Sequence, residues 1–305
     1  MKPDSRPLAV GVLGRGVVDP EVPVIHADDA GLLRGLAAFE TLRVYGGKPF
    51  AMTEHLERLR ASASRMQLPE PDADGLADLA AAVLTAADTP DCSLRFTMTG
   101  GRQGGAPVSM AVVLPIPGNL EEVRSRGIAA VSLQLGTDPR LRKDAPWLLD
   151  GVKSTSYAVN MAAFDEARRR GAEDAIFIAA EGSVLEGPVT NVWWRSGNTL
   201  FTPALDLGIL AGVTRAHVIS SAEALGYDVS EGWYPRSELA ASDEYFRCSS
   251  VRELMPIVRL DGVPVAGGHP GRRARALEAG LLRVAEGLGR ESREPRTGRG
   301  SRRVV

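Results

Sequence analysis

The sequence contains few cysteines and no long apolar run. Cys92 and Cys248 are the two cysteines among 305 residues, and their wide separation fits neither metal-type spacing nor a disulfide framework. No run of about 18 apolar residues occurs, which argues against a membrane span. The first residues also lack the apolar stretch and small-residue cleavage site of a secretory signal. We therefore expect a soluble protein of a reducing compartment, located in the cytoplasm.

An excess of charge of one sign is also absent. The formal net charge is −2 and the calculated pI about 6.2, so no overall positive field attracts nucleic acid or an anionic membrane. The last residues, 289–305, are basic and almost free of apolar side chains, which predicts a disordered tail. Nucleic-acid binding by this tail is an alternative, although charged termini are usually only solvated. We expect a small-molecule substrate, and neither nucleic acid nor membrane as a partner.

Length and patterning predict two domains. A chain of 305 residues exceeds the roughly 250 residues at which single cores stop growing. In its first third, strand-like segments lie at 8–14, 39–45, 94–100 and 108–116. Between them, a helix capped by Thr53 and a second amphipathic helix carry apolar residues at helical spacing: Leu56, Leu59, Ala63 and Met66, then Leu76, Leu79, Ala80 and Val83. This pattern predicts a small N-terminal α+β domain over residues 1–121.

The rest of the chain predicts a larger, strand-rich domain over residues 122–288, joined by a linker at 117–125. Its elements are strands near 126–135, 175–180, 189–194, 243–249 and 257–265, a polar loop at 137–146, and helices over 155–170, 213–225 and roughly 272–288. The predicted fold class is therefore α+β with two domains, followed by the tail at 289–305.

Lysine is scarce enough for each one to be considered separately. Of 36 basic residues, only Lys2, Lys48, Lys143 and Lys153 are lysines. Lys153 lies in LDGVKSTSYAVN, between an apolar segment and a predicted helix. Apolar surroundings lower the pKa of a lysine, and the neutral amine is the form that attacks an aldehyde. Lys153 is therefore the candidate nucleophile, with an ordinary surface lysine as the alternative.

Six segments resemble, in order, those of the class IV (fold-type IV) enzymes that depend on pyridoxal 5'-phosphate (PLP). They are DDAGLLRGLAAFETLRVYGGKPF, HLERLR, GVKSTSY, VLEGPVTNVWW, GILAGVTRAHVI and SSVRELMPIVRLDG. The family includes D-amino-acid and branched-chain aminotransferases and aminodeoxychorismate lyase. The resemblance extends over roughly residues 26–288. It implies the two-domain fold of D-amino-acid aminotransferase, PLP as the cofactor, and a homodimer with the active site between the domains.

The same resemblance assigns roles around the PLP ring. Lys153 is at the position of the lysine that binds PLP covalently and then moves the substrate proton. Glu186, in the E-G-x-x-x-N segment, is at the position of the acid that pairs with the ring nitrogen; a surface carboxylate is its plain alternative. Tyr157, four residues after Lys153, is expected on the same helix face as Lys153, close to the phenolic oxygen of PLP. A core aromatic is the alternative for Tyr157.

Four further residues are implied at the phosphate of PLP. Arg58 occupies the arginine of the pattern H-L-x-R, and its guanidinium suits a phosphate. Val213 and Thr214 open a predicted helix, whose free N–H groups and dipole attract anions. Ser250 is the expected hydroxyl donor. The alternatives are a solvated arginine, a plain N-cap at Thr214 and a loop hydroxyl at Ser250.

Within the family, the sequence is most like aminodeoxychorismate lyase, which removes pyruvate from 4-amino-4-deoxychorismate and leaves 4-aminobenzoate. Thr41 occupies the place of a threonine thought to assist proton transfer in the lyase; otherwise it is simply a strand former. Arg102, in the glycine-rich GGRQGG, is expected to bind a substrate carboxylate, with a turn arginine as the alternative. Arg95 is the second candidate for that contact.

One segment departs from the family pattern. Where relatives read aromatic-G-D-G or R-G-D-G before the phenylalanine, this chain has Arg34-Gly35-Leu36-Ala37-Ala38, which changes polarity and backbone freedom near the expected substrate. Two other functions therefore stay open. One is a class IV aminotransferase of the branched-chain or D-amino-acid type, acting on an amino acid or amine, and the other is a non-catalytic protein that binds PLP or a metabolite.

Overall fold

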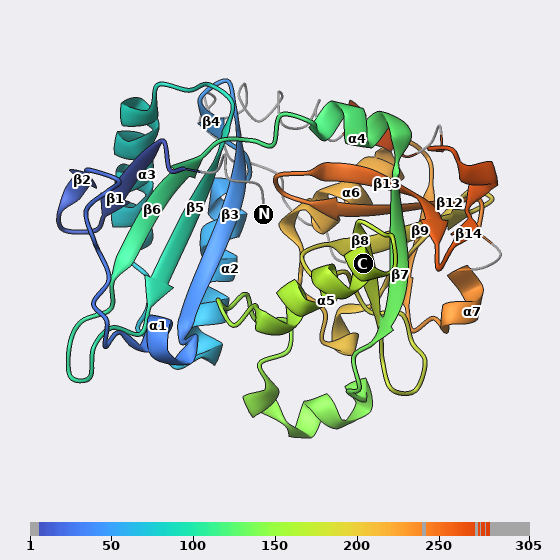
Figure 1. Ribbon diagram of the computed structural model, residues 1–305, viewed down its shortest axis with the longest axis horizontal. Helices are drawn as coiled ribbons and strands as arrows, with labels where there is room; N and C mark the ends of the chain where they lie inside the picture. Colours follow the sequence, from blue (N-terminus) through green and yellow to red (C-terminus); the bar gives the residue numbers. More distant parts are fainter. Residues whose placement is uncertain (1–5, 240–241, 272–273, 275, 278, 281–305) are drawn as a thin grey trace, which may run out of the picture.

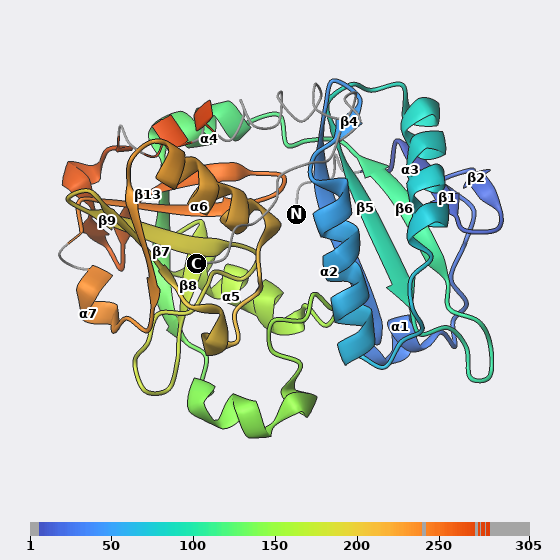
Figure 2. The ribbon, with the colours of Figure 1, turned by 180° about the vertical axis from the view of Figure 1, so that it is seen from behind.

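The protein consists of two units, each built on its own β-sheet, as the computed structural model shows (Figures 1 and 2). The structure describes residues 6–239, 242–271, 274, 276–277 and 279–280. The tail predicted over 289–305 lies outside the described residues, and the helix predicted over 272–288 lies mostly outside them. None of the helices in the described part of the chain has the length and apolar character needed to cross a bilayer.

The first unit is a six-stranded antiparallel sheet in the order β2-β1-β6-β5-β3-β4. Its strands are β1 (Ala9–Val12), β2 (Gly16–Val18), β3 (Ala37–Tyr45), β4 (Lys48–Pro49), β5 (Cys92–Thr99) and β6 (Ser109–Leu114). Its helices are α1 (Ala30–Arg34), α2 (Met52–Arg65) and α3 (Ala73–Ala87). Helices α2 and α3 cover one face of this sheet, seen in front of the strands in Figure 2.

The alternation of side chains along each strand decides which residues face the helices. In β5, Leu94, Phe96 and Met98 lie in the core under α2 and α3, because successive side chains of a strand point to opposite faces. Arg95 lies between them in sequence and therefore on the opposite face. The same rule places Glu40 of β3 on the helix side and Phe39 and Thr41 on the other.

The second unit is an eight-stranded mixed sheet in the order β11-β10-β9-β12-β13-β7-β8, with β14 paired to β13. Its strands are β7 (Ile128–Gln134), β8 (Asp174–Ile178), β9 (Asn191–Ser196), β10 (Thr199–Pro203), β11 (Asp228–Gly232), β12 (Glu244–Ser249), β13 (Glu253–Leu260) and β14 (Val263–Pro264). Its helices are α4 (Leu120–Arg126), α5 (Ala158–Arg169), α6 (Val213–Ala224) and α7 (Arg236–Leu239), with 3-10 turns at Pro139–Asp144, Pro146–Leu148, Leu205–Leu207 and Ala266–Gly268. Separate apolar clusters lie on both faces of this sheet.

Several local predictions from sequence were wrong. Ala51, not Thr53, precedes α2, and its left-handed backbone begins the helix without a side-chain cap. Residues 120–125 of the predicted linker form most of α4, because Val123 packs against an apolar cluster of the second unit. The polar loop contains one 3-10 turn, and a second begins at its last residue, Pro146. Strands β10 and β11 were not predicted. The helix predicted from 155 begins only at Ala158.

The segment that carries Lys153 is held by the first unit although it precedes α5 of the second. Its backbone pairs with the start of β3: the N–H of Phe39 donates to the carbonyl of Lys153 at 3.0 Å, and that of Thr155 to Ala37 at 2.9 Å. Gly35, whose φ is +66°, ends α1 directly against Ser156. The departure at 34–38 therefore forms the wall against which the lysine segment packs.

Substitution of Gly35 by Ala tests this contact. Any L-residue at positive φ costs about 1–2 kcal/mol. At Gly35 the new Cβ would also collide with Oγ of the exposed Ser156, which must rotate away and lose its hydrogen bond to the carbonyl of Gly35, at a further cost of about 0.5–1.5 kcal/mol. Gly14→Ala is the matched control, since Gly14 has φ +79° and open space around it. Denaturant unfolding should show the larger loss for Gly35→Ala, partly restored by Ser156→Ala. Equal losses in the two glycine variants would contradict the collision.

Candidate active site

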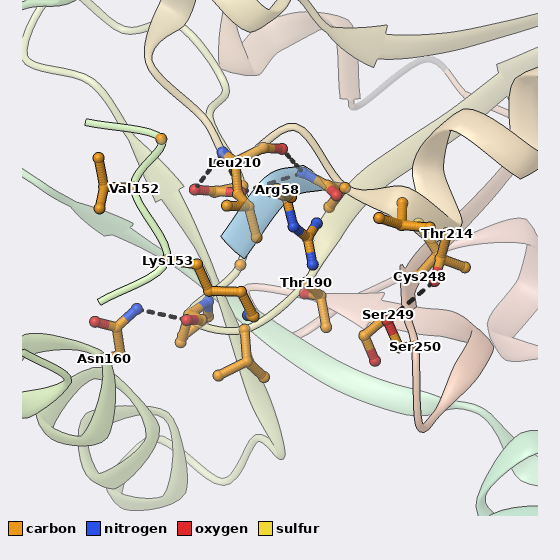
Figure 3. Close-up of a pocket in the computed structure, with 18 of the residues that line it drawn as sticks. Arg58, Val152, Lys153, Asn160, Thr190, Leu210, Thr214, Cys248, Ser249 and Ser250 are labelled. Carbon is orange, nitrogen blue, oxygen red and sulfur yellow. Dashed lines mark hydrogen bonds between the residues drawn. The ribbon is translucent and has the colours of Figure 1, made fainter. Parts of the chain in front are cut away.

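A pocket lies where the lysine segment, α2, α5, α6 and the loop after β12 meet (Figure 3). Seven of the residues predicted from the sequence line it, and these are Arg58, Lys153, Tyr157, Glu186, Val213, Thr214 and Ser250. They come from both units and from positions almost 200 residues apart. In the view of Figure 3, Arg58 lies between Lys153 on one side and Thr214 and Ser250 on the other.

The amine of Lys153 lies among both anionic and cationic groups. Burial lowers its pKa to about 8, Glu40 and Glu186 act against this, and Arg58 and Arg95 lower it further. The backbone N–H of Lys153 donates to Oγ of Ser62 at 3.2 Å, and its Nζ lies 4.5 Å from the centre of the Phe39 ring. Near neutral pH, a useful fraction of this amine is therefore uncharged and nucleophilic.

Glu186 lines the pocket and is held by hydrogen bonds from Leu210 and Asn191. The backbone N–H of Leu210 donates to both of its carboxylate oxygens at 3.1 Å, and Nδ2 of Asn191 donates to Oε2 at 3.2 Å. Nδ2 of Asn191 also donates to the carbonyl of Leu210 at 3.0 Å. These bonds fix the direction of the carboxylate, so Glu186 can present a negative charge to a bound ring.

The opposite end of the pocket is built for an anion. Helix α6 begins there with Gly212 as its N-cap and no side-chain cap, so first-turn N–H groups have no acceptor within the helix. The hydroxyls of Thr214 and Ser250 lie 3.5 Å apart at this point. Because Gly212 precedes the helix, Thr214 is not the plain N-cap that the sequence allowed as an alternative.

Arg58 completes this end from the first unit. Its Nε and Nη2 donate to the two carboxylate oxygens of Glu40, each at 2.7 Å, and Nη1 donates to the carbonyl of Ala211 at 2.9 Å. These bonds use three of the five N–H donors of a guanidinium. The other two N–H donors remain for a ligand. Glu40 therefore fixes the orientation of the Arg58 guanidinium without using all of its donors.

A histidine lies behind Arg58. Nδ1 of His55 bonds to Oε2 of Glu40 at 2.7 Å, and Nε2 lies 3.5 Å from Oγ of Ser250. His55 and Glu40 have 0% exposure. Burial would raise the pKa of Glu40, but the hydrogen bonds from Arg58 and His55 outweigh it and lower that pKa to about 2. Glu40 is therefore a buried anion shared by two partners.

Tyr157 lines the pocket, but not for the reason given by its spacing. Lys153 lies in an irregular segment and Tyr157 is the N-cap of α5, so the prediction that they share a helix face was wrong. The Tyr157 ring meets the Phe39 ring edge-on, with centres 5.3 Å apart. Burial and the neighbouring Glu186 raise the pKa of Tyr157 to about 12, so its hydroxyl stays protonated and can donate.

Thr41 and Arg95 lie beside the pocket rather than in its lining. They are opposite each other in the β3–β5 register, on the same face as Phe39. The guanidinium of Arg95 lies 4.0 Å above the Phe39 ring, and burial lowers its pKa. No carboxylate pairs with Arg95 among the described residues, which makes it a desolvated cation close to Lys153.

Arg102 is not brought to this pocket within the chain. It is about half exposed, and its Nε bonds to both carboxylate oxygens of Asp28 at 2.9 Å. Its predicted contact with a substrate carboxylate stays a prediction.

The donor set fits the PLP implied by the sequence. Arg58, the α6 N-terminus and two hydroxyls suit a phosphate. The fixed carboxylate of Glu186 suits a basic ring nitrogen, and the amine of Lys153 suits an aldehyde. A side chain at Gly212 would collide with Asn191, so the backbone at the anion end stays bare. Within the residues that the structure describes, no cluster of His, Cys, Asp and Glu side chains could hold a metal ion.

Sequence reasoning missed Glu40, His55 and Asn191. All three lie within motifs already noted, FETLRV, HLERLR and E-G-x-x-x-N, so position next to a motif residue was the available signal. Their roles could not be predicted, because each acts through contacts with residues distant in sequence or, for Asn191, with a backbone group.

The comparisons with known proteins agree with this geometry. The model of the family "amino-transferase class IV" matches residues 37–260. The "bifunctional aminodeoxychorismate lyase / D-amino acid transaminase" of Mycobacterium tuberculosis is 35% identical, over 81% of this chain and 89% of its own. The aminodeoxychorismate lyase of Bacillus subtilis is 30% identical, over 84% and 87%. A hypothetical aminotransferase from M. tuberculosis in its PLP-bound form superimposes with a TM-score of 0.86 and 32% identity, covering 92% of this chain and 99% of that one.

The pKa of Lys153 can be tested by competitive acetylation with acetic anhydride, read out by mass spectrometry of its peptide. Because only the neutral amine reacts, labelling of Lys153 should reach half its maximum near pH 8 and then level off. Lys48, the exposed first residue of β4, is the internal control. A half-maximum for Lys153 near the ordinary lysine value of about 10.4 would contradict the effect of burial.

Proposed function

The chain belongs to the class IV aminotransferase family, and from that premise we propose that it is an aminodeoxychorismate lyase, which converts 4-amino-4-deoxychorismate to 4-aminobenzoate and pyruvate. It is a PLP-dependent enzyme of this family. The observation that carries the proposal is the desolvated Lys153 amine, placed between the Arg58 anion site, the fixed Glu186 carboxylate and the unpaired Arg95 cation.

Bound PLP supplies an electron-withdrawing ring that accepts the charge developed at the substrate carbon. Arg58, the N–H groups of Val213 and Thr214, and the Ser250 hydroxyl would hold its phosphate. Glu186, oriented by hydrogen bonds from Asn191 and the Leu210 N–H, would hold a proton on the ring nitrogen. Tyr157 would donate from the α5 side.

Lys153 has two tasks in this proposal. As a neutral amine it attaches the cofactor, and when free it can take the proton from carbon 4 of the substrate on Nζ. Loss of that proton and of the enolpyruvyl group, with cleavage of its carbon–oxygen bond, leaves the aromatic ring of 4-aminobenzoate and, after tautomerisation, pyruvate. A pKa of about 8 suits an amine that both accepts and returns a proton near neutral pH.

Arg95 is the group best placed for a substrate carboxylate. It lies on the Phe39 ring, on the face that carries Thr41, and has no acid partner among the described residues. Thr41 lies next to it in the register, where its hydroxyl would assist proton transfer. In this proposal, Arg95 takes over the carboxylate contact that the sequence assigned first to Arg102.

A second candidate is D-amino-acid transamination. The name of the M. tuberculosis relative includes both activities, and a cation beside Lys153 suits the carboxylate of an amino acid equally well. The two reactions use the same residues and differ in the fate of the proton. We place the lyase first because Thr41 faces Arg95 in the β3–β5 register and because the names of two relatives include aminodeoxychorismate lyase.

The proposal also includes a homodimer in the cytoplasm and the domain limits 1–121 and 122–288. Large apolar side chains are exposed on α1 and on the 3-10 turns before Lys153, two segments at the lower edge of the molecule in Figure 1. Trp147 is 73% exposed, and Leu32, Leu33, Leu141 and Leu148 are exposed as well. A second copy covering them would remove this apolar surface from water.

Product analysis distinguishes the two reactions. We expect the purified enzyme to release 4-aminobenzoate and pyruvate in equal amounts from 4-amino-4-deoxychorismate, and Lys153→Ala to release neither. D-Alanine alone, without a keto acid, should leave the visible absorption of bound PLP unchanged. If D-alanine bleaches that absorption and 4-amino-4-deoxychorismate yields no product, the lyase is excluded and the transaminase is supported.

Substitution of Arg95 by Gln tests the carboxylate contact. A lost charge-assisted hydrogen bond costs about 1.5–3 kcal/mol, so KM should rise by roughly 10- to 150-fold with a smaller change in kcat. Arg102→Gln is the matched control, because Arg102 is exposed and bound to Asp28, and its KM should change little. A large rise in KM for Arg102→Gln alone would instead restore the assignment made from the sequence.

A further inference from the structure

The anion end of the pocket is backed by two buried groups that do not line it. Glu40 of β3 and His55 of α2 have 0% exposure, and together they contact the Arg58 guanidinium and the Ser250 hydroxyl. One carboxylate thus connects the cation and a hydroxyl that would both hold a phosphate. The following inference rests on the proposed role of Arg58 at the phosphate, and not on which reaction the enzyme catalyses.

Hydrogen-bond roles fix the tautomer of neutral His55. An ionised Glu40 can only accept, so Nδ1 of His55 must donate to it. Nε2 of the neutral ring then carries no hydrogen and can only accept from Ser250. A serine hydroxyl has one hydrogen. If Ser250 gives it to His55, none is left for a phosphate, and if Ser250 gives it to the phosphate, Nε2 loses its donor.

The charges at the anion end of the pocket also do not balance when a phosphate dianion binds there. Glu40 and Arg58 cancel, and a phosphate dianion adds two negative charges next to the positive end of α6. The groups that face His55 are Glu40 from β3, Arg58 from α2, Ser250 from the β12–β13 loop and Lys153 at longer range. Before phosphate binds, burial, Arg58 and Lys153 keep the pKa of His55 below its ordinary value.

We propose that His55 takes up one proton from solvent when a phosphate dianion binds at Arg58. The proton goes onto Nε2, which then donates to Oγ of Ser250, so that Ser250 turns its own hydrogen toward the phosphate. Glu40 holds the new positive charge through Nδ1 while it aims Arg58. His55 and Glu40 are thus positioning residues, and cofactor binding is coupled to protonation of a buried histidine.

The direct test is an NMR titration of the imidazole signals of the full-length apoprotein. The chain has four histidines, His26, His55, His217 and His269, so each signal can be assigned by substitution. Sulfate is the probe, because it stays a dianion from pH 5 to 9 and has no titration of its own in that range. We expect the pKa of His55 to rise by on the order of one pH unit or more with saturating sulfate. An unchanged pKa would overturn the proposal.

The pH dependence of sulfate affinity gives a second readout that a purely structural role would not change. Between pH 5.5 and 7, below the pKa of Lys153, uptake of one proton makes the affinity fall by up to tenfold per pH unit as pH rises. His55→Asn keeps a donor for Glu40 but has no second ring nitrogen, so its affinity should be independent of pH. His217→Asn is the matched control on α6 and should retain the slope of the unaltered protein. A slope retained in His55→Asn would overturn the proposal.

Two further variants test separately the role of Glu40 toward His55 and the role of Arg58 at the phosphate. Glu40→Gln should leave His55 neutral with sulfate bound and abolish the slope; a charged His55 in that variant would contradict the role of Glu40. Arg58→Gln should weaken sulfate at every pH, and unchanged binding would overturn the assignment of the phosphate end and this inference with it. If His55→Asn or Glu40→Gln does not fold, the titration of the unaltered protein still decides. Loss of the lyase assay alone leaves all these expectations unchanged.

Discussion

The pairing of the Lys153 segment with the start of β3 is the contact on which the site depends. Two backbone hydrogen bonds, Phe39 to Lys153 and Thr155 to Ala37, attach an irregular stretch of the second unit to a strand of the first. Because β3 also carries Glu40 and is covered by α2 with Arg58, one strand positions both the amine and the phosphate cation. The distance between the reactive end and the anchoring end is thereby set by a single rigid element.

Electrostatics in the pocket follow from that arrangement. Lys153 is desolvated between two carboxylates and two guanidiniums, and burial prevails, since its pKa falls to about 8. Glu40 shows the opposite balance, because direct hydrogen bonds from Arg58 and His55 outweigh burial. For an amine with only long-range partners, burial prevails and lowers the pKa, whereas a carboxylate with contact partners keeps its charge. The site thus holds an amine with a lowered pKa next to the ion pair of Arg58 with the buried Glu40.

The sequence predicted elements and motif residues well, and contacts poorly. The apolar stripe of α3, the start of α6 and the β13–β14 hairpin were readable, because periodicity and helix-start patterns report local structure. The seven residues that line the pocket were found through ordered motifs. The bond of Glu40 to Arg58 and that of His55 to Ser250 join residues 18 and 195 positions apart, which no local pattern encodes. Tyr157 shows the reverse case, because it lines the pocket although the geometric reason for predicting it was wrong.

The departure at 34–38 bears on the substrate side and leaves the phosphate side unaltered. Ala37 and Ala38 are buried, and Ala38 forms a bridge with Ser154 next to Lys153. Small apolar residues at these positions let the lysine segment approach β3 closely and bring no charge near Nζ, which favours the neutral amine. An aspartate at one of these positions would bring a negative charge near Arg95 and Lys153. That charge would counteract the effect of Arg95 and stabilise the protonated form of the lysine. The altered segment thus leaves Arg95 as the unpaired cation for a carboxylate that only the substrate can supply.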